Sequence, residues 1–116
     1  MFGALLEKLM TDGVHMFDDD GKISVIAEIK AKVGHEEEVR VILHELVGPA
    51  RAEDGCEVYH LLEDKKKPGS FSTYEEWVNV GALEKHLAGA GAKAALEKAQ
   101  TMLDGEMKLT VLRKLL

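Results

Sequence analysis

A carboxylate, an indole and an imidazole stand close together in the segment TYEEWVNVGALEKHLAGAG, which covers residues 73–91. In an extended strand, alternation places Glu75 and Trp77 on the same face. In the helix that follows, spacings of three and four residues place His86 on the apolar stripe. If this stripe packs on the sheet, His86 approaches Glu75 and Trp77 in an apolar surrounding. Such a group suits acid–base catalysis, and it equally suits a structural pair beneath a tryptophan, so both interpretations stay open.

The elements that must position these groups follow from hydrophobic periodicity and from turn residues. Apolar alternation predicts strands, and apolar spacings of three and four residues predict helices. The predicted order is strand 23–33, helix 35–54, strand 56–64, strand 70–78, helix 80–103 and strand 107–115. Asn79 is the expected N-cap of the second helix, and Gly89 and Gly91 are expected to interrupt that helix before it resumes. This β-α-β-β-α-β order predicts an α+β, ferredoxin-like sheet with its helices on one face.

Alternation also divides the residues of each strand between two faces of the sheet. One face collects two predicted sets: Val25, Ala27, Ile29 and Ala31 from the first strand, and Phe71, Thr73, Glu75 and Trp77 from the third. Two helices cover only one face, so the other face must meet water or a partner. Its apolar candidates are Tyr59, Leu61, Tyr74, Val78 and Leu112. An exposed apolar patch usually marks an interface, which predicts a homodimer packed sheet to sheet; a monomer in light scattering would contradict it.

The first part of the chain is expected to be separate from this domain. Phe2, Leu5, Leu6 and Leu9 recur at helical spacing, and the turn segments TDG and DDDGK then interrupt the pattern. We expect residues 1–22 to form an amphipathic arm with a linker, and residues 23–116 to form the domain. So short a helix is marginal alone and would have to dock on apolar surface. An untied leader is the alternative interpretation.

Composition narrows the class of protein. The 116 residues fit one domain, and 46% of them are hydrophobic, as in a globular protein. The formal net charge of −6 argues against binding to nucleic acid or to anionic lipid. Cys56 is the only cysteine, so an internal disulfide is impossible and a reducing, cytoplasmic location is expected. No signal peptide and no membrane span are predicted.

Three further patterns have simpler explanations than catalysis. GAGAKA, residues 89–94, fits a dinucleotide fingerprint, but it follows a helix instead of a strand and is interpreted as a helix break. HEEEVRVILHE begins like a zinc-protease motif, but Val39 stands where the second histidine should be, so no metal is expected. Cys56 lacks an activating neighbour in sequence and is predicted to be a small buried hydrophobe.

Three short motifs resemble the antibiotic biosynthesis monooxygenase superfamily in order and approximate spacing. They are RAEDGC, YEEW and LEKH, and the resemblance extends over about residues 23–115. It implies a dimeric α/β barrel of ferredoxin-like subunits. Haem-degrading members resemble this chain around AEI in the first strand but carry Asn where this chain has Ile29, which counts against haem. Many members, including an isomerase, have a second histidine where this chain has Gly91, which weakens an isomerase function.

The resemblance implies a cofactor-independent monooxygenase that acts on a quinol or a related planar phenol with oxygen, and we expect no metal, flavin or haem. A deprotonated quinol is electron-rich enough to reduce oxygen directly, so the protein must supply a base, a dry pocket and hydrogen-bond donors. His86 is the expected base, and Glu75 is expected to orient it or to share its proton. Trp77 and Phe71 would stack on the substrate ring, and Tyr59 or His60 would supply a donor. Leu83 and Ile29 complete the expected substrate-binding set.

Two other functions use the same residues. An isomerase or tautomerase of a small carbonyl compound would use the same base without consuming oxygen. A non-catalytic dimer that binds an apolar ligand would lose no activity in His86→Ala. Measuring oxygen consumption with a quinol distinguishes these functions from the monooxygenase.

Overall fold

The structure of the protein, a computed structural model, describes residues 21–116. The elements are β1 (Ile23–Lys30), α2 (Glu36–Arg51), β2 (Cys56–Glu63), β3 (Ser70–Trp77), α3 (Val80–Ala88), α4 (Ala90–Ala99), the short 3₁₀ helix η2 (Gln100–Met102) and β4 (Lys108–Arg113). The predicted β-α-β-β-α-β order is confirmed, with the second helix divided into α3 and α4. The arm expected over residues 1–22 lies almost wholly outside the described residues.

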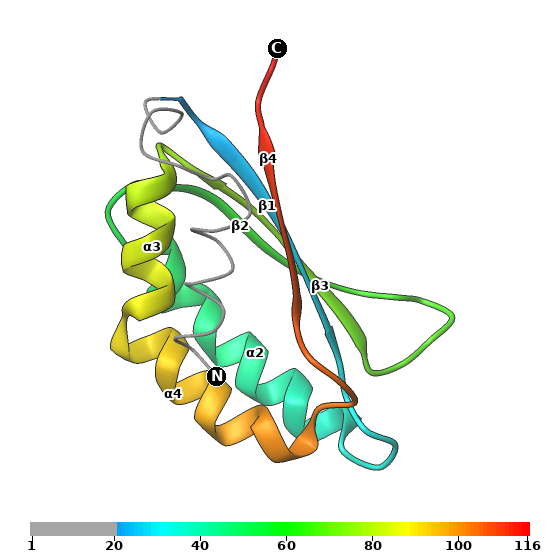
Figure 1. The fold of residues 1–116 in the computed structure, drawn as a ribbon. Helices are drawn as coiled ribbons and strands as arrows, with labels where there is room; N and C mark the ends of the chain where they lie inside the picture. Colours follow the sequence, from blue (N-terminus) through cyan, green and yellow to red (C-terminus); the bar gives the residue numbers. More distant parts are fainter. Residues whose placement is uncertain (1–20) are drawn as a thin grey trace.

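The strands form one antiparallel sheet in the order β2-β3-β1-β4. β1 and β2 run parallel with β3 inserted between them, which is the split βαβ arrangement of a ferredoxin-like fold. All three α-helices cover the same face of the sheet (Figure 1). The opposite face is uncovered in the described part of the chain, and β2 and β4 are the two edge strands of an open sheet.

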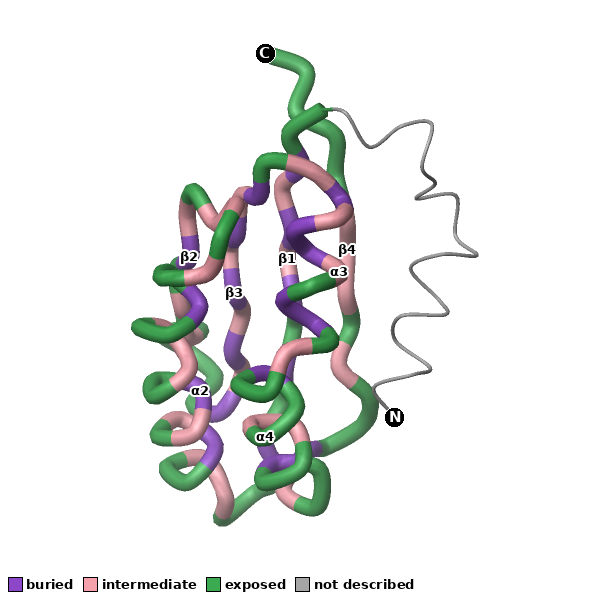
Figure 2. Tube along the Cα trace, turned by 90° about the vertical axis from the view of Figure 1, so that its left-hand side faces the viewer, coloured by how far each residue is buried: buried purple, intermediate pink, exposed green. Residues whose placement is uncertain are grey.

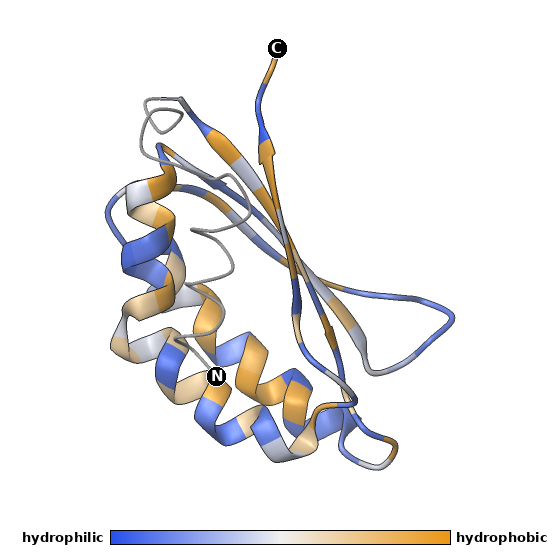
Figure 3. Cartoon of the chain, viewed as in Figure 1, coloured by the Kyte–Doolittle hydropathy of each residue, from blue (hydrophilic) through white to orange (hydrophobic). Residues whose placement is uncertain are grey.

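The helix-facing side of the sheet forms the core, with the residues that alternation predicted. Val25, Ala27 and Ile29 of β1 are buried, and so are Phe71, Thr73, Glu75 and Trp77 of β3. Buried positions alternate with intermediate ones along β3, and with intermediate and then exposed ones along β1 (Figure 2). Hydrophobic residues concentrate where helices and strands face each other, while the loop joining β2 to β3 is hydrophilic (Figure 3).

The prediction for the uncovered face is half right. Tyr74, Val78 and Leu112 keep partial exposure, but Tyr59 and Leu61 face the helices. A register shift between Cys56 and Val58 causes the difference. Such a bulge adds one residue to a strand, and one extra residue moves every later side chain to the other face. Tyr59 therefore lies opposite Glu75 on the core side.

Local capping explains how α3 begins and ends. The Asn79 side chain accepts a hydrogen bond from the backbone N–H of Ala82 at 2.9 Å, which confirms the predicted N-cap. At Gly89 the backbone becomes extended, with ψ of 157°, and this separates α3 from α4. The GAGAKA segment is thus a helix break, as its position predicted. No helix within residues 21–116 is long and apolar enough to span a bilayer.

A charged cluster ties α2 to the β2–β3 hairpin. The guanidinium of Arg40 donates to both carboxylate oxygens of Glu63, at 2.9 and 2.6 Å, and also pairs with Glu37. The backbone N–H of Gly69 donates to Glu63 as well. These hydrogen bonds, with that from Arg40 the strongest cause, lower the pKa of Glu63 to about 2.

This depressed pKa predicts acid-dependent stability. In an unfolded chain a glutamate has a pKa of about 4.3, so the contribution of Glu63 is complete above about pH 5 and is lost as the pH falls towards 2. We expect Arg40→Gln to lower the melting temperature near neutral pH, and the difference from the parent to shrink between about pH 5 and 2. Melting curves across pH test this, with Lys98→Gln on the exposed side of α4 as the control. A difference that stays constant with pH would contradict it.

Candidate active site

A cavity lies between the helix-facing side of the sheet and the three helices. Its volume is about 60 Å³, room for only a few water molecules. Most of its wall is apolar, and the polar side chains in it are Tyr59, Thr73, Glu75 and His86. These four come from β2, β3 and α3, so the cavity depends on the packing of distant parts of the chain.

Glu75 is a carboxylate buried in this wall, with 3% of its surface exposed. The Thr73 hydroxyl donates to one oxygen at 2.6 Å, and the indole N–H of Trp77 donates to the other at 2.9 Å. Both donors lie two residues away along β3, on the face that alternation gives them. Glu75 is thus held by residues of its own strand, and the two hydrogen bonds stabilise its buried carboxylate.

His86 is buried, and its hydrogen-bond partner lies in another part of the chain. Its Nδ1 lies 2.9 and 3.1 Å from the two carboxylate oxygens of Glu53, which follows α2. The expected pairing of His86 with Glu75 is therefore replaced by a pairing with Glu53, while Glu75 is hydrogen-bonded to Thr73 and Trp77. A carboxylate only accepts hydrogen bonds, so Nδ1 carries the proton, and Nε2 of the neutral ring keeps a lone pair.

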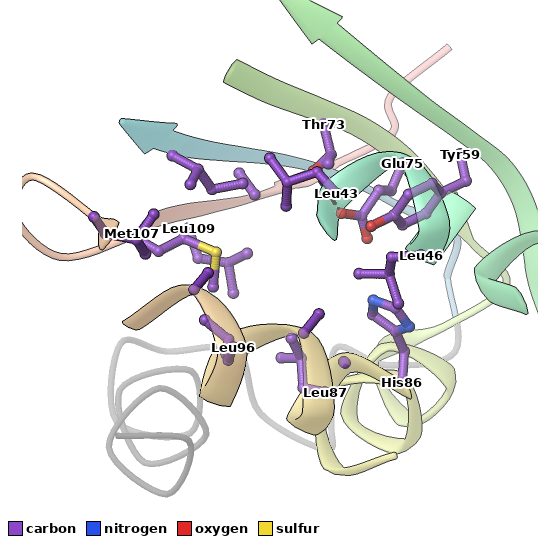
Figure 4. Close-up of a pocket in the computed structure, with 16 residues that line it drawn as sticks. Leu43, Leu46, Tyr59, Thr73, Glu75, His86, Leu87, Leu96, Met107 and Leu109 are labelled. Atoms are coloured by element: carbon purple, nitrogen blue, oxygen red, sulfur yellow. Dashed lines mark hydrogen bonds between the residues drawn. The ribbon is translucent and has the colours of Figure 1, made fainter. Parts of the chain in front are cut away.

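Aromatic rings hold the imidazole on two sides. The Trp77 ring lies 4.8 Å from the His86 ring at an interplanar angle of 32°, and the Tyr59 ring lies 5.7 Å away at 66°. The imidazole stands at the same end of the cavity as Glu75 and Tyr59 (Figure 4). Fixed on three sides, His86 has a defined orientation relative to the cavity.

The turn that carries Glu53 requires glycine at position 55. Gly55 has a φ of +85°, and a Cβ there would lie 2.6 Å from the Cβ of Ala82 in α3. The carbonyl of Gly55 also accepts a hydrogen bond from the backbone N–H of Val78 at 2.9 Å. This close approach of the turn to the start of α3 brings Glu53 within reach of His86, 33 residues later.

Tyr59 adds a hydroxyl to the polar end of the cavity. Burial raises the pKa of this hydroxyl, and the charges of Glu75 and Glu53 raise it further, so Tyr59 stays protonated and able to donate. Of the two donors that the sequence offered, Tyr59 is the one that lines the cavity. His60 is exposed on the opposite face of β2, since neighbouring residues of a strand point to opposite sides.

The sequence profile of the antibiotic biosynthesis monooxygenase family matches residues 22–98. The chain belongs to this family. The resemblance carried by RAEDGC, YEEW and LEKH is thereby confirmed. The profile ends inside α4, so its match includes Glu53, Glu75 and His86 but not β4.

Solved structures agree with this membership. The protein PA3566 from Pseudomonas aeruginosa is 31% identical, with a TM-score of 0.78 over 83% of this chain and 96% of that one. A structure described as an antibiotic biosynthesis monooxygenase is 27% identical, with a TM-score of 0.76 over 80% and 98% of the two chains. An uncharacterized protein of Synechocystis is 32% identical over 84 residues. Those residues are 72% of this chain, which spans 57% of that relative's length.

Four other residues were expected to bind the substrate, and all of them lie in the core: Ile29, Phe71, Trp77 and Leu83. Of these, only Ile29 lines the cavity. Trp77 and Leu83 are fully buried and pack in one cluster. Phe71 is buried in a second cluster, with the Arg40 guanidinium over its ring at 5.6 Å. Trp77 thus touches the site groups His86 and Glu75 instead of facing the cavity.

Sequence reasoning missed three components of this family member's site. Glu53 belongs to the RAEDGC motif, but no local pattern connects it to His86. Thr73 was placed on the correct face without a role, although its spacing of two from Glu75 was a usable signal. The alanines of α4 that line the cavity lie in the part of the predicted helix that resumes to residue 103, where no site residue was expected. Residues 21–116 contain no cluster of three potential metal ligands.

Proposed function

We propose that the protein is a monooxygenase that acts on a quinol or a related planar phenol without a cofactor, and that the cavity is its substrate site. One observation carries the proposal. An imidazole whose Nδ1 is bound by a carboxylate stands in the wall of an otherwise apolar cavity. A carboxylate behind the imidazole is the arrangement that orients a general base and steadies the imidazolium that forms.

His86 is proposed to remove a hydroxyl proton from the substrate through Nε2. The resulting anion passes one electron to oxygen, and the two radicals then combine at a ring carbon. Loss of water from the adduct leaves a hydroxylated quinone. For a quinol, one oxygen molecule gives this product and one molecule of water, with both reducing electrons supplied by the substrate.

The other polar groups are proposed to bind the substrate. The Tyr59 hydroxyl donates to the substrate oxygen as negative charge develops on it. Glu75 accepts a hydrogen bond from a second substrate hydroxyl that lies on the same side of the ring as the reacting one, since each carboxylate oxygen has a second lone pair. Ile29 contributes to the apolar wall, and Trp77, Phe71 and Leu83 act indirectly by supporting this wall.

The test is oxygen uptake with a reduced naphthoquinone that has a free ring position. We expect enzyme-dependent uptake of one oxygen molecule per quinol and, with ¹⁸O₂, one labelled atom in the product. Quinols also oxidise spontaneously, but that reaction gives hydrogen peroxide and an unhydroxylated quinone. Peroxide and product must therefore be measured together. Uptake equal to that of the spontaneous reaction, with no label in the product, would remove the proposal.

A homodimer is proposed to cover the open face of the sheet. Leu62 and Leu112 of this face are 52% and 43% exposed, and Ile26 and Tyr74 lie between them on β1 and β3. Apolar side chains spread over a sheet face are stabilised by burial against a second sheet. Light scattering at micromolar concentration should give twice the chain mass. The mass of a single chain would contradict the dimer.

A further inference from the structure

We propose that the natural substrate carries a hydrocarbon substituent, which extends from the reacting ring along α4 into the apolar end of the cavity. This inference rests on the proposed function for the identity of the ring, and it adds the chemical class of the rest of the molecule. The cavity is divided into a polar end and an apolar end, and that division is the first observation behind it.

The two ends are built from different residues. Tyr59, Glu75 and His86 gather at one end, while Leu96, Met107 and Leu109 lie at the other (Figure 4). A bare quinol has hydroxyl groups on opposite sides of its ring, so it would place a polar group against the apolar end at a cost in desolvation. A molecule with its polar groups on one side and hydrocarbon on the other fits both ends.

Small residues on α4 provide the space for this extension. Ala92, Ala95 and Ala99 line the cavity at spacings of three and four, so α4 presents methyl groups to it at every lining position except Leu96. A helix that faces a core usually presents larger aliphatic residues there, as α2 does with Leu43. Gly89 separates α4 from α3, which frees α4 to lie at its own distance from the sheet.

The Tyr59 hydroxyl fixes which end binds the polar group. Tyr59 is only 4% exposed and lines the cavity, and its side chain makes no hydrogen bond to another described residue. Because no fully enclosed side-chain polar atom of residues 21–116 lacks a partner, this hydroxyl borders accessible space, and the cavity offers it a place to meet a ligand oxygen. With the oxygen held there, the rest of the ligand must run towards Met107.

The far wall can yield to a ligand larger than the present cavity. Met107 lies between η2 and β4, outside any helix or strand, and Leu96 is only partly buried. Methionine is unbranched and adapts to different shapes. The α4 wall and the segment before β4 are therefore the parts expected to move apart when the ring and its substituent enter.

Binding of para-alkylphenols tests the inference without any turnover. Phenol itself and the methyl, butyl and octyl members of the series carry one hydroxyl and differ only in the hydrocarbon. Calorimetric titration under nitrogen gives their Kd values. We expect Kd to fall by about fourfold for each methylene that becomes buried, and to level off once the apolar end is full.

Two matched variants locate the substituent. Ala95→Leu fills the apolar end and should weaken octylphenol binding by about tenfold or more, while changing methylphenol binding by less than about threefold. Ala94→Leu makes the same change on the exposed side of α4, and it should alter neither affinity. Tyr59→Phe should weaken every phenol by a similar factor, because it removes the contact to the shared hydroxyl. Melting curves confirm that each variant is folded.

The outcomes separate this inference from the proposed function. A Kd that does not depend on chain length, equal effects of Ala95→Leu and Ala94→Leu, or no binding by any phenol would each overturn the inference. If binding depends on chain length but no alkyl quinol causes oxygen uptake, the inference of an amphipathic ligand is supported and the monooxygenase function is contradicted. Turnover of quinols at a rate that does not depend on chain length would support the monooxygenase and remove the hydrocarbon substituent.

Discussion

Replacing His86 with alanine is expected to lower kcat for a quinol by about 10²- to 10⁴-fold, the usual contribution of a general base. The change should fall on kcat more than on KM, because the imidazole acts only as the proton leaves. Steady-state oxygen uptake against quinol concentration measures both constants. The spontaneous oxidation rate is subtracted at each concentration.

Glu53 variants test whether the carboxylate acts through this imidazole. Glu53→Gln keeps the size of the side chain, but its amide can donate to Nδ1 and so move the proton of the neutral ring to Nε2. That tautomer cannot accept a proton from the substrate, so kcat should fall towards the level of His86→Ala while KM changes little. Glu53→Asp keeps the charge on a shorter side chain and should restore part of the activity. A purely structural Glu53 would show no such difference between Gln and Asp at equal stability.

His44 offers a matched control for the histidine substitution. It lies exposed on α2, and His44→Ala should leave both kinetic constants unchanged. Full activity in His86→Ala would contradict its role as the base. Glu75 would then be the remaining candidate for the base at the polar end of the cavity, because the raised pKa of Tyr59 keeps its hydroxyl protonated.

Local patterns were sufficient to predict the faces of the central elements. Strand alternation placed Thr73, Glu75 and Trp77 on the buried side of β3, and helical spacing placed His86 inward on α3. These predictions succeed because one face of each element is buried, which fixes the periodicity of the sequence. The N-cap at Asn79 is equally local.

The partner of His86 and the position of Tyr59 could not be predicted in this way. The contact between Glu53 and His86 joins the end of α2 to α3 and depends on the turn at Gly55. Tyr59 faces the core only because of the register shift before Val58, and no residue type marks that shift in the sequence. The Glu53–His86 contact and the orientation of Tyr59 both depend on how separate elements pack together. Hydrophobic periodicity describes each element alone and does not predict such packing.

Trp77 shows how the same residue can be correctly placed and still have a different role. Its position beside Glu75 suggested a ring that stacks on the substrate. In the structure the indole has no exposed surface, contacts the His86 ring and donates to Glu75. A residue in this position should contribute chiefly to stability and to the arrangement of the site.

Trp77→Ala is therefore expected to destabilise the protein by about 3–5 kcal/mol, as the loss of a large buried aromatic side chain usually does. For a domain of this size, each kcal/mol corresponds to a melting-temperature shift of about 4–8 °C, so the variant should melt far below the parent. Urea unfolding followed by circular dichroism measures the free energy. Fluorescence cannot be used for the comparison, because Trp77 is the only tryptophan in the chain.

Trp77→Phe separates the packing of the ring from its hydrogen bond. Phenylalanine keeps an aromatic ring in the core but removes the N–H, which leaves one oxygen of the buried Glu75 without its donor. We expect a smaller loss of about 1–3 kcal/mol, the usual cost of a buried acceptor that loses its partner. Val41→Ala on the exposed side of α2, away from the site and from the proposed dimer face, indicates how much a truncation costs outside the core. If Trp77→Ala were as stable as the parent but failed to bind phenols, the indole would be a ligand surface after all, as the sequence pattern first suggested.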